Sequence, residues 1–123
     1  RGVADGVSGD DLEPFAALIR ALPQVENPVV PLNGWLLHGE QAVAMFYELP
    51  EGADLQEHVH GAQWGVVLAG RVDFTIGGNT ATFVAGDTYS IDAGVPHSAF
   101  MHPGTVGIDV FGDPHPYRQR RDA

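Results

Sequence analysis

The sequence predicts an all-β domain preceded by one short helix, and three observations support this class. From Val29 onward the chain divides into short runs rich in β-branched and aromatic residues. Turn residues such as Gly77-Gly78-Asn79 separate these runs at near-regular intervals, which is typical of an antiparallel sandwich or barrel. Apolar and polar residues alternate along 71–76, as expected of a strand whose two faces have different surroundings.

The first 22 residues predict a leader and a helix. Residues 1–9 are small and polar and predict a loose leader. We expect a helix over 10–22, because Asp10 or Asp11 is a suitable N-cap and the apolar residues that follow are spaced by three and four. Pro23 ends this pattern.

The remainder of the chain predicts a β-barrel over 29–111 and an extended tail over 112–123. We expect the 123 residues to form one domain, since a chain of this length buries a core of its own. The expected strands are Trp35–His38, Ala42–Leu49, Leu55–His60, Trp64–Ala69, Val72–Ile76, Ala81–Val84, Thr88–Ile91, His97–His102 and Val106–Phe111.

Composition excludes several classes of partner and chemistry. The formal net charge is −10, which disfavours binding to nucleic acid and to an anionic membrane surface, because both depend on cationic side chains. All six basic residues are arginine, so a lysine Schiff base is ruled out. No apolar run is long enough to span a bilayer, and the absence of cysteine is compatible with a reducing compartment. We therefore expect a cytoplasmic protein that binds a small molecule.

Three histidines form the most informative pattern in the chain. His58 and His60 are two residues apart, so on a strand their side chains would share one face. His97 lies in a second glycine-rich segment. Imidazole is a common ligand of divalent transition metals, and three imidazoles leave positions free for water or substrate. The histidines therefore predict a metal site that takes part in function.

The two histidine segments resemble the paired signature motifs of the cupin superfamily. Gly52, the His58-x-His60 pair and Gly70 match the first motif. The matches to the second motif are Gly86, Gly94 and His97. The resemblance implies a small jelly roll, or double-stranded β-helix, like that of single-domain bacterial cupins, with His58, His60 and His97 as metal ligands.

The sequence departs from these motifs at three positions. Gln63 stands where the family has a metal-binding glutamate, and the gap after His60 is one residue short; Asp92 and Met101 replace a proline and an asparagine of the second motif. We expect Gln63 to be either a fourth ligand, through its carboxamide oxygen, or a hydrogen-bond partner of a ligating histidine. A neutral ligand set leaves the charge of a dication uncompensated, so the ion polarises a carbonyl more strongly.

The resemblance implies a metal-dependent enzyme that acts on a small carbonyl- or hydroxyl-bearing molecule as an isomerase, cyclase or lyase. The expected cofactor is one divalent ion (zinc, manganese, iron or nickel), with zinc favoured. The alternatives are a non-catalytic binding or sensing module, an iron-dependent dioxygenase, and a structural jelly roll with empty histidines. We also expect a homodimer, in which 35–38 or the tail near Tyr117 covers an exposed strand edge.

The remaining chemically active residues have structural interpretations. His38, His102 and His115 are expected to be ordinary surface or partly buried histidines, and Glu57 to be solvated. Tyr89 is expected in the core or the wall of the pocket. The sequence shows no obvious inward-facing carboxylate near the motifs that would act as a general base.

Overall fold

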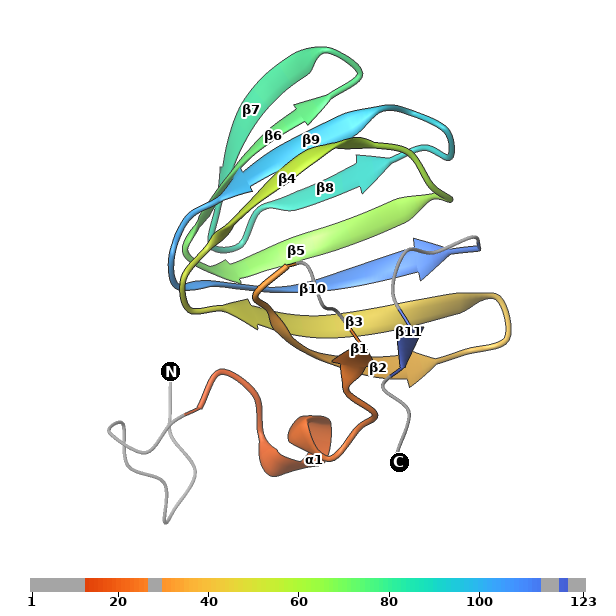
Figure 1. Ribbon diagram of the computed structural model, residues 1–123, viewed down its shortest axis with the longest axis vertical. Helices are drawn as coiled ribbons and strands as arrows, with labels where there is room; N and C mark the ends of the chain where they lie inside the picture. The colour runs from red at the N-terminus through yellow and green to blue at the C-terminus, as the bar shows by residue number, and fades with distance from the viewer. Residues whose placement is uncertain (1–12, 27–29, 114–117, 120–123) are drawn as a thin grey trace.

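The computed structural model describes residues 13–26 and 30–113 and the backbone of 118–119, and it confirms the all-β class and the jelly-roll fold. Two antiparallel sheets face each other (Figure 1). In order across the five-stranded sheet lie β2 (Asn33–His38), β3 (Ala42–Leu49), β10 (Thr105–Gly112), β5 (Gln63–Ala69) and β8 (Thr88–Ile91). In order across the four-stranded sheet lie β4 (Ala53–His58), β9 (His97–Met101), β6 (Arg71–Ile76) and β7 (Asn79–Val84). A separate pair joins β1 (Val25–Glu26) to β11 (Arg118–Gln119).

The space between the two sheets holds the core. Strand β3 shows how the sequence builds it, because Val43, Met45, Tyr47 and Leu49 are each no more than 2% exposed while the residues between them are only half-buried. This is the period-two pattern of a strand with one face on a core. The registers of β3 and β9 therefore decide which side chains meet inside the molecule.

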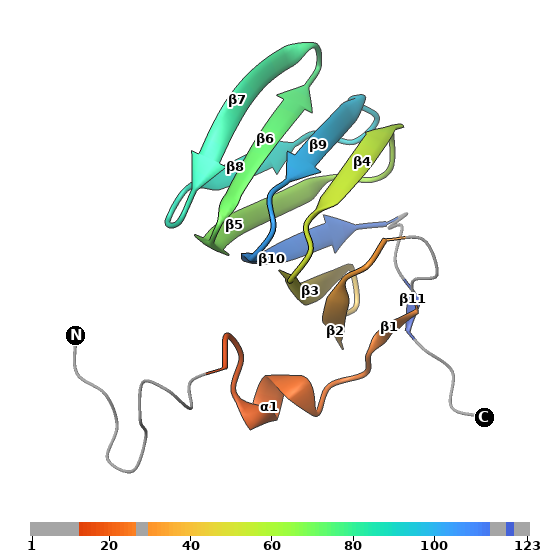
Figure 2. The ribbon, with the colours of Figure 1, turned by 60° about the vertical axis from the view of Figure 1, so that its left-hand side comes forward.

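The N-terminal helix is shorter than predicted. Helix α1 spans Ala17–Arg20, and Ala16 before it is extended, with no side-chain cap. Phe15 is buried edge-on against Trp35 and Phe46. Helix α1 lies on the side of the five-stranded sheet that faces away from the other sheet (Figure 2). Tertiary packing of this ring decides the local conformation, since a helix of one turn has little stability of its own.

Some predictions fall on residues that the structure does not describe. The loose leader over 1–9 and the expected N-caps at Asp10 and Asp11 lie outside the described residues, as does most of the extended tail, including His115. Within the described ranges, α1 is too short to cross a membrane, and so no candidate span is found there.

Candidate metal centre

The three predicted histidines converge at one end of the space between the sheets. His58 ends β4 and is paired with His97, which begins β9. One ring nitrogen of each of His58, His60 and His97 lies within 4.8 Å of the others. The sequence prediction that these side chains form one cluster is therefore confirmed.

The local backbone differs from the expected strand. Strand β4 ends at His58, so His60 lies in the following loop and not on the same strand face. The pairing of β4 with β9 shifts between Leu55 and His58, which is the signature of a β-bulge or similar irregularity that re-aims a side chain. In the loop, a Cβ at Gly61 would overlap the backbone of 112–113. Only glycine therefore lets the loop carrying His60 approach the end of β10.

Each histidine is fixed through its Nδ1 nitrogen. The Nδ1 atom of His58 lies 2.7 Å from the carbonyl oxygen of Gln56. That of His60 lies 2.8 Å from the carbonyl oxygen of Gly61, and that of His97 lies 2.9 Å from the carbonyl oxygen of Val95. A carbonyl oxygen only accepts hydrogen bonds, so each Nδ1 carries the proton and each neutral ring presents its Nε2 lone pair. This is the tautomer in which histidine ligates a metal through Nε2.

The Nε2 atoms of His60 and His97 are 3.1 Å apart. With both Nδ1 atoms protonated, neither Nε2 of the neutral rings has a proton to share, so two lone pairs face each other. Burial is the main cause that lowers the pKa of each ring. Repulsion from His58 lowers both values further, and the backbone hydrogen bonds oppose the shifts. A bound cation would satisfy these lone pairs, and so the donor set fits a divalent metal.

Gln63 lies in the same cavity as the histidines. It begins β5, is 7% exposed and hydrogen-bonds through its side chain to Asp109. A carboxylate only accepts hydrogen bonds, so while Asp109 is ionised the Gln63 amide nitrogen donates and the amide oxygen has capacity for another partner. That the oxygen binds the metal directly stays a prediction.

Asp109 is the site residue that the sequence analysis missed. It lies on β10 with a side chain that lines the cavity, and it is 5% exposed. The Tyr89 hydroxyl donates a hydrogen bond to its carboxylate. Burial raises the pKa of Asp109 to about 7, although the hydrogen bonds from Tyr89 and Gln63 oppose the shift. The cavity therefore holds a carboxyl group that exchanges a proton near neutral pH, contrary to the sequence expectation.

Two glycines make room for the polar network around Asp109. A Cβ on Gly65 would overlap both the Asp109 carboxylate and the Tyr89 ring and hydroxyl. Gly107 likewise makes room for the hydroxyl of Tyr47, which hydrogen-bonds to Tyr89. Burial and the adjacent Asp109 charge raise the pKa of Tyr89 well above its ordinary range, so this hydroxyl keeps its proton and donates at neutral pH.

The cavity has a volume of about 210 Å³. Its polar members are the three histidines, Gln63 and Asp109. Its other lining residues are mainly apolar: Val30, Leu32, Met45, Tyr47, Leu49, Leu55, Phe74, Ala99, Met101 and Phe111.

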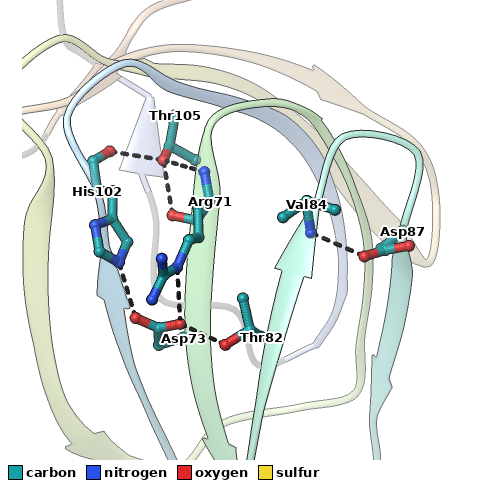
Figure 3. A network of polar contacts seen from close by, with 7 residues as sticks. All are labelled: Arg71, Asp73, Thr82, Val84, Asp87, His102 and Thr105. Atoms are coloured by element: carbon teal, nitrogen blue, oxygen red, sulfur yellow. Dashed lines mark hydrogen bonds and ion pairs between the residues drawn. The ribbon is translucent and has the colours of Figure 1, made fainter.

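The outer face of the four-stranded sheet carries a second, unrelated polar cluster. The Nε2 atom of His102 lies 2.8 Å from the Asp73 carboxylate, and Thr82 donates to the same carboxyl group at 2.7 Å (Figure 3). Arg71 adds a longer contact to Asp73 of 3.4 Å. As the sequence analysis expected, His102 lies away from the histidine cluster, and His38 is an exposed residue.

Comparison with known proteins identifies the family. The family model described as "Cupin domain" matches residues 45–106, half of the chain, and the protein therefore belongs to the cupin family. A comparison with curated proteins found no match.

Solved structures share the fold. An RmlC-like cupin from Shewanella frigidimarina is 24% identical, with a TM-score of 0.65 over 73% of this chain and 83% of that chain. KdgF from Halomonas sp. is 22% identical, with a TM-score of 0.64 over 80% of this chain and 87% of that chain. Oxalate decarboxylase from Bacillus subtilis is 19% identical, with a TM-score of 0.63 over 82% of this chain but 30% of that chain.

Proposed function

We propose that this cupin is a metal-dependent enzyme that isomerises a small carbonyl-bearing molecule, with Asp109 as the residue that moves the proton. One observation carries the proposal: three Nε2 lone pairs that suit a divalent metal line the same cavity as a buried carboxyl group. Among the described residues, the outer His102–Asp73 pair belongs to no group of three or more side chains that could hold a metal ion.

His58, His60 and His97 would hold the ion, and Gln63 is the fourth ligand we propose. When bound, a divalent metal supplies Lewis acidity that polarises a carbonyl group of the substrate. Zinc suits imidazole ligands and can expand from four to five ligands, so a substrate oxygen would join the three imidazoles and Gln63. The mainly apolar lining of the cavity lowers the local dielectric constant, which strengthens electrostatic interactions inside it.

Asp109 accepts a proton from the carbon next to the carbonyl group. The electron pair of the broken C–H bond forms the carbon–carbon double bond of the enol form, and the proton returns to a different atom of the same molecule. No oxidant or reductant is consumed, so the reaction is an isomerisation. Tyr89 and Gln63 hold the carboxyl group in place through their hydrogen bonds. A pKa near the working pH suits a group that both accepts and returns a proton.

The metal part of this proposal is tested by the metal content of the purified protein. We expect about one divalent ion per chain in the wild type. His97→Ala should lose it, because one ligand is removed from a set that must bind the ion together. His102→Ala is the matched control, since His102 lies on the outer face, and it should retain the metal. Equal metal content in the two variants would contradict the assignment.

The catalytic part is tested by deuterium exchange. In D₂O, the methyl protons of acetone or of acetophenone should exchange faster with the wild type than with His97→Ala, as followed by proton NMR. Exchange of either ketone supports proton transfer next to a carbonyl group. Full metal occupancy without exchange of any ketone would favour a module that binds its ligand without turning it over.

A further inference from the structure

The cavity has a polar end and an apolar end, as the strand registers define. Along β9, His97 is followed on the same face by Ala99 and Met101. Along β3, Met45 pairs with Asp109 and Leu49 pairs with Thr105, four residues further along. Two residues of a strand span about 6.6 Å, and Met101 and Leu49 each lie two such intervals along their strands from His97 and Met45. Met101 and Leu49 therefore form an apolar floor that lies well beyond the histidine cluster.

Among the described residues that line this cavity, none is lysine or arginine. The chain has no lysine. Arg20 stacks over Trp35, with its guanidinium carbon 4.7 Å from the ring centroid, and Arg71 contacts Asp73 on the outer face. Among the side chains that the structure describes, none therefore pairs with a carboxylate or a phosphate at the apolar end.

We infer that the substrate has one carbonyl end at the histidines and an uncharged, apolar body on the floor formed by Met101 and Leu49. This inference rests on the proposed function and specifies its substrate class. A dry apolar cavity of about 150 Å³ holds benzene, and a cavity of about 210 Å³ therefore suits a molecule of about eight non-hydrogen atoms by the same proportion. Small polyanions such as oxalate lack the apolar body that this floor would contact.

The two methionines of the chain report on this cavity directly. Met45 and Met101 are the only methionines in the sequence, and both line the cavity, one beside Asp109 and one on the floor. Protein labelled with ¹³C in the methionine methyl groups gives one NMR signal from each. A probe that occupies the whole cavity should shift both signals and should saturate with concentration.

The experiment compares acetophenone with acetone, which have the same carbonyl group and differ in the apolar body. With the protein as purified, acetophenone should shift both methionine signals, and acetone should bind at least tenfold more weakly because it has no body to contact the floor. After treatment with a chelator, acetophenone should still bind, because the floor holds its body. Binding of acetone as tight as that of acetophenone, or complete loss of acetophenone binding on chelation, would overturn the inference.

Ala99→Leu adds volume inside the cavity. Ala44→Leu is the matched control, because it makes the same change on the face of β3 that points away from the cavity. The first should weaken acetophenone binding at least tenfold, and the second should leave it unchanged. Unaltered binding to a folded Ala99→Leu protein would show that the probe sits elsewhere. The wild-type comparison of the two probes decides the matter even where Ala99→Leu fails to fold. Because these readouts measure binding alone, an error in the catalytic proposal leaves them interpretable.

Discussion

Asp109 and Asp73 carry the same carboxyl group in opposite surroundings. Asp109 faces the cavity from β10, and burial raises its pKa to about 7. Asp73 lies on the outer face of β6, where the hydrogen bond from His102 is the main cause that lowers its pKa to about 2 (Figure 3). Hydrogen bonds from Thr82 and Arg71 lower it further.

The difference lies in the neighbours and in the solvent. Asp109 has two neutral donors, Tyr89 and Gln63, and these do not offset the cost of burying a charge. Asp73 is open to water and has a guanidinium group close by. Hydrogen bonds to a carboxylate therefore do not by themselves lower its pKa. When the cost of desolvation is large, desolvation decides whether the pKa rises or falls. Only Asp109 is suited to exchange a proton near neutral pH.

The largest expected effect separates the two residues by activity. Asp109→Asn removes the proton acceptor but keeps a side chain of the same size, so ketone exchange should fall at least 100-fold, the lower end of what general acid–base catalysis contributes. Asp73→Asn, the matched control, should leave exchange within about twofold, because a surface change far from the cavity has no route to the reacting atoms. Proton NMR of the ketone in D₂O measures both. Similar rates for the two variants would refute the role given to Asp109.

An intermediate effect concerns stability against pH. A raised pKa means that native Asp109 keeps a proton that the unfolded chain loses between about pH 4 and 7. The free energy of unfolding of the wild type should therefore fall as pH rises through this range, by up to about 1.4 kcal/mol per pH unit. Asp109→Asn does not titrate and lacks this contribution.

Urea unfolding of both proteins, with chelator present and at several pH values, measures this difference. The lowered pKa values of His60 and His97 act in the opposite direction, since neutral rings favour the native state as pH rises toward 6.5. These histidines are present in both proteins, so subtracting one curve from the other isolates Asp109. Parallel curves would mean that folding leaves the pKa of Asp109 unchanged.

Much of the fold follows from features that are local in the sequence. Alternation and turn residues predict the strands closely, and the glycine-framed histidines predict the cluster, because these patterns depend on near neighbours. The short helix, by contrast, depends on where the Phe15 ring packs. The position of His60 depends on an irregularity in the pairing of β4 with β9. Neither cause is visible in the sequence around those residues.

Asp109 shows why part of the site could not be predicted. Alternation groups Asp109 with Gly107 and Phe111, but pairing with β3 and β5 decides that this face is the inward one. A signal existed in Gly65, because glycine inside a strand often marks a close approach by another group.

Ligation by Gln63 and the homodimer stay predictions. Strand β2 does lie at a sheet edge, and light scattering at micromolar concentration tests the dimer.

The smallest expected effect belongs to Asp73 and is confined to acid. Its lowered pKa stabilises the native state above about pH 4, and this contribution should be lost as pH falls from about 4 to 2. Asp73→Asn should therefore move the acid-unfolding midpoint upward, but only on the order of a few tenths of a pH unit, because exposed ion pairs contribute little. Circular dichroism during acid titration measures the midpoint. His102→Ala should cause a similar shift, since it removes the main donor to the same carboxylate. A shift with His102→Ala but none with Asp73→Asn would mean that the histidine acts through another partner, and the contrast between the two aspartates would then rest on Asp109 alone.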